Sequence, residues 1–351
     1  MKASTSLARS HAPRTAWIGA VAIGFCALMA LPLLGDVSLV LSVSLICALA
    51  VLALSMSFLW GYAGVLSFGQ TLFFGLGGYA FAILSMNYEM SLPALLLAIV
   101  IPAIVGAVLG YFMIYGRISD IYLSVMTLVM TLIFEKAIRS TSGPEYVIGS
   151  VRLNGQNGIP NVPGLLLPWQ DDTLGIDGIF YLTVAVMVAV YVGFRLLLGT
   201  SFGRILVGIR ENETRMQLLG FDSRRYKLIA FTLCSAIAGL SGVLLALWGN
   251  FVSPEMFSLN QAALVVIWVI VGGRSTLVGP ILGVAFIQTL STWLGTNGVG
   301  QVNLILGFIL IVVVLALPAG LLPALGGLAR RLFVRGHAKV APAATAAGAK
   351  P

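Results

Sequence analysis

Residues Ser201–Lys227 read SFGRILVGIRENETRMQLLGFDSRRYK and form the only long charge-dense run between two strongly apolar halves of the chain. Six of the 20 Lys and Arg residues lie in this run, against three acids. Its first apolar residues recur at helical spacing, at Phe202, Ile205, Leu206 and Ile209. Gly220 then provides a stop signal. The run is therefore predicted to be an amphipathic helix in an aqueous loop.

The composition around this loop is that of a membrane protein. Of the 351 residues, 59% are hydrophobic and 9% are charged, which leaves too few polar side chains to cover a soluble globule of this size. The 40 glycines suit membrane helices, where small residues let backbones approach closely. The net charge of +8 is spread over short loops and termini, so we expect a lipid bilayer and no nucleic acid as its partner.

Ten apolar segments are candidates for membrane spans. The first follows a short basic segment and is long enough to be an uncleaved span rather than a signal peptide. The segments are Ala16–Leu34, Val37–Leu59, Val65–Met86, Leu92–Tyr115, Ile118–Ile138, Ile176–Leu198, Leu228–Trp248, Leu259–Val271, Leu277–Leu294 and Val302–Leu322. With both termini cytoplasmic, 17 of the 20 Lys and Arg residues fall inside, as the positive-inside rule requires. The sequence predicts an all-α polytopic membrane protein with about ten transmembrane helices.

This topology divides the chain into three parts. Residues 1–15 are a cytoplasmic N-terminal segment, residues 16–335 a transmembrane domain, and residues 336–351 a cytoplasmic tail whose Ala-rich composition predicts disorder. Within the domain, residues 140–173 form an external loop. Its many Gly, Pro and Asn residues indicate irregular structure rather than a helix. Residues 201–227 form the cytoplasmic loop.

Two glycine-rich segments interrupt the pattern of straight spans. Trp60–Gly78 contains six glycines, and Val271–Pro280 leaves a preceding apolar piece too short to cross a bilayer as a helix. Broken helices at membrane depth are tolerated where they are buried in protein or line a cavity, and a matched pair is a pointer to a translocation site. The similar pattern of the two segments hints at an internal repeat. The glycines expected to matter are Gly61, Gly64, Gly69, Gly272, Gly273 and Gly279.

Several polar side chains lie within the predicted spans. They could hydrogen-bond a neutral or zwitterionic solute passing between helices, or simply bond carbonyls of their own helix and bridge neighbouring helices. The candidates for a translocation path are Ser67, Gln70, Thr71, Thr127 and Gln288.

The chain has little that suggests catalysis. It contains no phosphate-binding G-x-x-x-x-G-K-[ST] loop, and its two histidines, His11 and His337, lie near the termini, so an enzyme is not expected. The rival to a subunit driven by partner proteins is a self-sufficient transporter or channel driven by an ion gradient. Such proteins generally need acids at mid-depth. Glu135 is near a span end, where it could be a proton site or an ion pair with Lys136 or Arg139.

Three stretches resemble a known family. Residues 202–247 read FGRILVGIRENETRMQLLGFDSRRYKLIAFTLCSAIAGLSGVLLAL, residues 266–283 read VIWVIVGGRSTLVGPILG, and residues 59–80 read LWGYAGVLSFGQTLFFGLGGYA. With SPEMFSLN at Ser253 and NGQNGI at Asn154, they are similar to the membrane-spanning subunit of ATP-binding-cassette importers for branched-chain amino acids and for urea or short amides. The resemblance covers most of the chain outside the termini.

The resemblance implies a permease subunit in a bacterial cytoplasmic membrane that works by alternating access. Its partners would be two cytoplasmic ATPase subunits, a second related permease subunit and a soluble periplasmic solute-binding protein. ATP and magnesium would bind the partners, with no cofactor on this chain. The cytoplasmic loop would be the coupling element on an ATPase, although a helix lying on lipid is the alternative. Thr214 stands where such loops carry an acid. The coupling residues would be Arg204, Arg210, Glu211, Asn212, Glu213 and Gly220.

Overall fold

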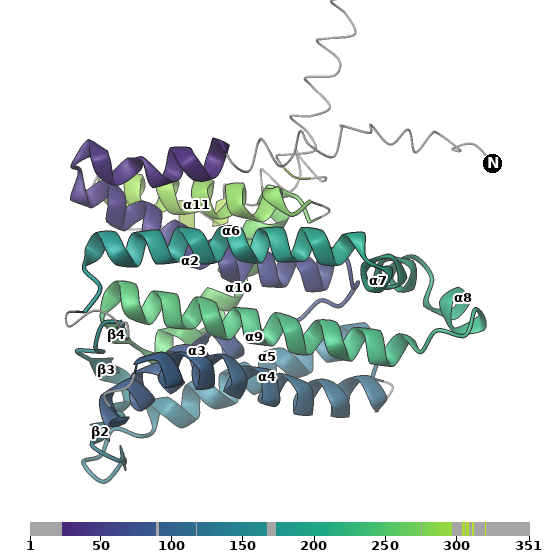
Figure 1. The fold of residues 1–351 in the computed structure, drawn as a ribbon. Coiled ribbons are helices and arrows are strands. Elements are labelled where there is room, and N and C mark those ends of the chain that lie inside the picture. The colour runs from purple at the N-terminus through teal and green to yellow at the C-terminus, as the bar shows by residue number, and fades with distance from the viewer. Residues whose placement is uncertain are drawn as a thin grey trace, which may run out of the picture.

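The computed structural model describes residues 23–88, 91–116, 118–166, 173–274 and 276–296, together with residues 304, 305, 307, 308, 311 and 320. Long helices dominate this part of the chain and lie roughly parallel in a bundle (Figure 1). After a short 3₁₀ turn, η1 (Leu31–Leu34), they are α2 (Val37–Gly61), α3 (Gln70–Tyr88), α4 (Ser91–Tyr115), α5 (Asp120–Arg139), α6 (Ile176–Gly199), α9 (Ser223–Gly249), α10 (Leu259–Gly272) and α11 (Val278–Thr296).

Six of the described helices are long and apolar enough to cross a membrane, namely α2, α4, α5, α6, α9 and α11. The prediction of an all-α polytopic membrane protein is confirmed at this level. The number of ten spans and the cytoplasmic position of both termini stay predictions. Of the expected spans, Ala16–Leu34 lies partly and Val302–Leu322 largely outside the described residues, as do the segments 1–15 and 336–351.

The two ends of the bundle differ in character (Figure 1). At one end lie two short helices, α7 (Ser201–Glu211) and α8 (Glu213–Leu218), and we call this the α7–α8 end. At the opposite end, the strand end, small strands pair with one another. They are β1 (Val147–Ile148), β2 (Val151–Arg152), β3 (Ile159–Pro160) and β4 (Phe251–Val252).

The predicted external loop therefore contains more order than its composition indicates. Strand β1 pairs with β2 within the loop, whereas β3 pairs with β4, which follows α9. Two 3₁₀ turns complete this end of the bundle, η2 (Gly155–Asn157) and η3 (Pro254–Phe257). The β3–β4 pairing ties the loop to the segment that leads into α10.

Helix α9 is the centre of the core and packs against α2, α3 and α4. The contact with α3 is made backbone to backbone, because a Cβ on Gly77 would overlap Gly239 and a Cβ on Gly242 would overlap the carbonyl oxygen of Phe74. Ser241 Oγ also donates a 2.7 Å hydrogen bond to the carbonyl oxygen of Ala48 in α2. Small residues thus place these three helices closer together than larger side chains would allow.

The first predicted break is confirmed. Helix α2 ends at Gly61, and the chain stays non-helical until α3 begins at Gln70, so the expected span start at Val65 is wrong. Gly64 has φ +78°, in the left-handed region that favours glycine, and Ser67 Oγ accepts a 3.2 Å hydrogen bond from the main-chain N–H of Gly69. This local turn chemistry delays the helix despite the apolar residues around it.

The second predicted break is confirmed as well. Helix α10 ends at Gly272, Gly273 has φ +107°, and α11 begins at Val278. The two helices pack so closely on each other that a Cβ on Gly272 would overlap the backbone of Gly279. At 14 residues, α10 is too short to cross a bilayer as a straight helix.

Candidate functional site

The loop between the two apolar halves folds as two helices rather than the single helix expected from its sequence. Thr200 caps α7 by accepting a hydrogen bond from Gly203 N–H at 3.4 Å. Asn212 then leaves the helical conformation, with φ −159° and ψ 98°, and its Oδ1 accepts a 2.9 Å hydrogen bond from Arg215 N–H. Asn212 therefore ends α7 and begins α8, as an N-capping residue does. Asn212, which was predicted to be a coupling residue, thus lies at the bend between α7 and α8.

The two helices differ in how they contact the bundle. In α7 the side chains of Leu206 and Ile209 are buried, as the apolar spacing predicted. In α8 no residue is buried, and the tip of the segment carries Leu218 and Leu219, which are 84% and 65% exposed. Gly220 follows them with φ +88° and reverses the chain, as expected of a stop signal. The sequence analysis did not single out these two leucines. The signal that could have found them is that they are apolar but lie outside the apolar stripe of α7.

Arg210 makes contacts within the chain itself. Its guanidinium donates a hydrogen bond to the main-chain carbonyl oxygen of Gly61, at the end of α2, and also pairs with Glu211. Gly64 lies against the same side chain, so that a Cβ there would come within 2.9 Å of Arg210 Cγ. Helix α7 is thereby joined to the first break by one charged side chain that binds a helix C-terminal carbonyl.

The second break meets the first at the same place. A Cβ on Gly61 would overlap the carbonyl oxygen of Arg274, and the Arg274 guanidinium lies over the Trp60 ring, 5.5 Å from its centroid. Cation–π contacts of this kind stabilise such junctions modestly. Two interruptions far apart in the sequence thus form one junction at the α7–α8 end, with Arg210 on it.

Four of the five predicted path residues gather around the first break and are buried. Ser67, Gln70, Thr71 and Thr127 each have 2% or less of their surface exposed. A Cβ on Gly69 would come within 3.0 Å of Thr127 Cβ, so α5 packs directly on the break. Gln70 Oε1 accepts a 3.2 Å hydrogen bond from Ser55 Oγ, whereas Gln70 Nε2 has no partner among the residues that the structure describes.

Gln288 lies apart from these four residues. It lines a cavity of about 430 Å³ between α2, α9 and α11, beside Ser42, Trp248 and Thr292. No charged side chain lines this cavity among the described residues. The structure therefore does not bring the five predicted path residues to one surface.

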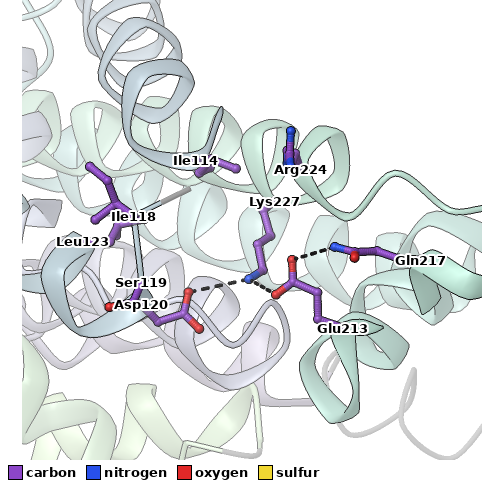
Figure 2. A pocket seen from close by; sticks show the side chains of 9 residues that line it. All are labelled: Ile114, Ile118, Ser119, Asp120, Leu123, Glu213, Gln217, Arg224 and Lys227. Carbon is purple, nitrogen blue, oxygen red and sulfur yellow. Dashed lines mark hydrogen bonds and ion pairs between the residues drawn. The ribbon is translucent and has the colours of Figure 1, made fainter. Parts of the chain in front are cut away.

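Glu213 also faces the bundle, where it binds Lys227 of α9 (Figure 2). Lys227 Nζ lies 2.7 Å from Glu213 Oε2 and 3.5 Å from Asp120 Oδ1. Partial burial acts to raise the pKa of Glu213, but hydrogen bonds from Lys227 and Ser223 and the nearby charges of Lys227 and Arg224 outweigh burial and hold this pKa below its ordinary value. The sequence did not single out Lys227 as the partner of Glu213, nor Asp120 as the second carboxylate beside Lys227.

Arg204, the remaining residue predicted for the coupling loop, makes local contacts. It donates to the carbonyl oxygen of Gly199 at 3.3 Å and to Ser201 Oγ at 3.2 Å. Both acceptors lie where α6 gives way to α7, so Arg204 stabilises the turn between the two helices.

Glu135 is an ion-pair residue. Arg139 Nε lies 2.8 Å from Glu135 Oε1, and another guanidinium nitrogen of Arg139 lies 2.6 Å from Glu255 Oε1 in η3. This confirms the interpretation of Glu135 as a partner of Arg139. It also ties α5 to η3 at the strand end.

The part of the chain that the structure describes contains no group of three His, Cys, Asp or Glu side chains able to hold a metal ion.

Comparison with known proteins matches residues 38–316 to the family described as "Branched-chain amino acid transport system / permease component". The chain is 28% identical over 292 residues to the high-affinity branched-chain amino acid transport system permease protein LivM of Escherichia coli. The aligned region covers 78% of this chain and 67% of LivM. The LivM protein of Salmonella typhimurium is 29% identical over the same shares. The ribose import permease protein RbsC of Bacillus subtilis is 29% identical over 34% of this chain and 38% of its own length. No solved structure matches.

Proposed function

Because this chain belongs to the family of permease components of branched-chain amino acid transport systems, we propose that it is the membrane-spanning subunit of an ATP-driven importer for branched-chain amino acids. Permeases of this family in bacteria are proteins of the cytoplasmic membrane, and the six apolar helices agree with that location. Urea or short amides are the other solute class to test, since the quoted motifs resemble importers for both.

The proposed assembly has two ATPase subunits on the α7–α8 side, a second permease subunit beside this one, and a solute-binding protein at the strand end. ATP and magnesium bind the ATPase subunits. The chain's own work is to bind the partners, to transmit their motion and to open a path for the solute. The strand end is external in this proposal, and both termini lie in the cytoplasm.

One observation carries the coupling part of the proposal: Arg210 of α7 binds the carbonyl oxygen of Gly61, where both helix breaks meet. A partner that moves α7 and α8 therefore pulls directly on the least regular part of two spans. A short segment can transmit a rigid-body motion in this way, because packed helices shift between discrete arrangements. We infer that this junction converts ATPase closure into a change of cavity access.

The exposed tip of the segment suits docking. Helix α8 lies beyond the end of the helix bundle (Figure 1). Leu218 at its end and Leu219 directly after it are exposed, so their apolar surface is available to a groove on another protein. By contrast, Arg210 and Glu213 are engaged with the permease itself. We therefore propose that the two leucines contact the ATPase, while the charged residues set the position of the segment.

The predicted path residues fall into two groups, and their contact with solute is a separate proposal for each group. Ser67, Gln70, Thr71 and Thr127 lie inside the subunit, so they could contact solute only if the first break opens. Gln288 lines a cavity that already exists. The breaks with their glycines are proposed as the moving part of the path and not as its fixed wall.

The test is transport by the whole complex. The chain is purified with the subunits that accompany it and reconstituted into liposomes with the binding protein, and uptake of labelled leucine and urea is measured with and without ATP. Uptake of leucine that requires ATP and survives an ionophore supports the proposal. ATP-dependent uptake of urea with no uptake of leucine would replace the solute. Uptake by the chain alone, without ATP and abolished by an ionophore, would establish the gradient-driven rival.

A further inference from the structure

Lys227 lies between two carboxylates that come from distant parts of the chain (Figure 2). Its Nζ lies 2.7 Å from Glu213 Oε2 in α8 and 3.5 Å from Asp120 Oδ1 in the first turn of α5. Lys227 itself belongs to the start of α9, and its side chain is only 11% exposed. One ammonium group therefore joins three helices at the α7–α8 end.

The position of α8 depends largely on such polar contacts, because its apolar packing is limited to contacts such as that of Met216 with Gly208 of α7. No residue of α8 is buried. Besides the Glu213 ion pair, Gln217 Nε2 donates to Ser223 Oγ at 2.8 Å, and this hydrogen bond also reaches the start of α9. A helix held by an ion pair and a hydrogen bond can detach at a lower free-energy cost than one held by buried side chains.

There is also space for α8 to move. A cavity of about 320 Å³ lies between α8, the start of α9 and the turn from α4 to α5. Apolar residues Ile114, Ile118 and Leu123 line one part of it, and Asp120, Glu213 and Lys227 line another (Figure 2). The charged groups thus border a void rather than a packed wall, and Lys227 Nζ already lies 3.5 Å from Asp120 Oδ1.

We propose that Lys227 is a positioning residue that holds α8 against the helix bundle through Glu213, and that Asp120 keeps Lys227 paired when α8 moves away. The inference rests on the proposed function, because it is the ATPase partner that moves α8. A largely buried ammonium that loses its counter-charge is costly. With Asp120 within reach, Glu213 leaves while Lys227 keeps a carboxylate beside it.

Hydrogen–deuterium exchange of residues 213–218 in the purified complex tests the first part. Lys227→Met is expected to speed exchange in α8 by roughly tenfold, and Glu213→Gln by a similar factor, because each removes the same contact. The double variant is expected to exchange no faster than Lys227→Met, since the contact is already lost. Lys227→Arg keeps the charge and is expected to restore slow exchange.

Arg225→Met is the matched control. Arg225 lies in the same turn of α9 as Lys227, its side chain is 76% exposed, and within the part of the chain that the structure describes it pairs only with nearby Asp222. Its removal takes away one positive charge without touching α8. Unchanged exchange in Lys227→Met, or equally fast exchange in Arg225→Met, would overturn the proposal that Lys227 holds α8.

Uptake and ATP hydrolysis in the reconstituted complex test the role of Asp120. Asp120→Asn is expected to leave α8 exchange within about twofold of wild type, because Glu213 still binds Lys227. It is expected to lower solute uptake per ATP hydrolysed, since Lys227 then lacks a second carboxylate. Wild-type uptake in Asp120→Asn would show that Asp120 has no such role. If the wild-type complex shows no ATP-driven uptake, the proposed function fails, while the exchange comparison still decides whether Lys227 holds α8.

Discussion

The guanidinium of Arg210 donates a hydrogen bond to the main-chain carbonyl oxygen of Gly61, 149 positions earlier in the chain. The bond joins the α7–α8 segment to the end of α2, at the junction of the two helix breaks. A charged donor on the terminal carbonyl of a helix satisfies an acceptor that has no partner within the helix. Arg210 is therefore a structural link between the loop and the membrane helices.

Removing this link is expected to separate ATP hydrolysis from transport. A hydrogen bond to a charged group contributes about 1.5–3 kcal/mol, so Arg210→Ala should lower solute uptake about tenfold or more while ATP hydrolysis continues. Arg225→Ala, which removes an exposed arginine that pairs with nearby Asp222, is the control. Uptake per ATP in the reconstituted complex is the measurement, and an equal fall in uptake and hydrolysis would contradict the link.

The glycine on the other side of that bond is expected to tolerate no side chain. In Gly61→Ala the new Cβ would overlap the carbonyl oxygen of Arg274, and overpacking of this kind costs about 1–3 kcal/mol. Gly193→Ala is the matched control, because a Cβ at Gly193 in α6 meets no atom within 4 Å. Thermal unfolding in detergent should show a lower midpoint for Gly61→Ala only. Equal midpoints would mean that the two breaks are not in contact.

The two exposed leucines at the end of α8, Leu218 and the following Leu219, predict a loss of partner binding without a loss of stability. Leu218→Ser with Leu219→Ser removes apolar surface that the permease does not bury, so its thermal midpoint should not change. Burial of a leucine in a partner contributes about 1.5–3 kcal/mol, so recovery of the ATPase subunits on purification should fall sharply. Leu218→Met, which keeps the apolar surface, should retain them. Retention by the double serine variant would place the docking surface elsewhere.

The ion pairs of Arg139 predict unequal effects for its two partners. Arg139→Met leaves Glu135 mostly buried without its partner, which costs about 1–3 kcal/mol. Glu255 is 68% exposed, so Glu255→Gln should cost less than about 1 kcal/mol. Adding Glu135→Gln to Arg139→Met should recover part of the loss. If Glu255→Gln proves the more damaging change in denaturation experiments, the burial argument fails.

Acid is expected to release α8. The pKa of Glu213 is below its ordinary value of 4.5, so its contribution to holding α8 is fully present above that pH and is lost as the pH falls through the lower folded-state pKa. Exchange in residues 213–218 should therefore speed up, after correction for the intrinsic pH dependence of exchange, only below pH 4.5. Glu213→Gln should show no such step. A step centred above that value would indicate another titrating group.

The sequence by itself determined the class of the protein and the approximate positions of its long helices and of the two breaks, whereas the start of α3 at Gln70 and the division of the loop into α7 and α8 came from the structure. Apolar runs of about 20 residues admit only helices in a bilayer, because every backbone group must be bonded within its own segment. The two helix breaks could also be predicted from their glycines, since Gly64 and Gly273 adopt backbone conformations that other residues rarely take. The division of the loop at Asn212 was harder to predict, because the apolar pattern continues past Asn212 and indicates one helix, whereas the capping side chain of Asn212 ends one helix and starts another.

Only the tertiary structure decided which of these features meet. Nothing in the spacing of residues shows that Arg210 turns inward to Gly61, that Arg274 lies beside the same glycine, or that Lys227 has Asp120 within reach. These contacts depend on the order in which helices pack, and that order is set by close approaches such as Gly77 on Gly239. A charge pattern reports that a residue is polar, whereas only packing decides whether its partner is another helix, the solvent or a second protein.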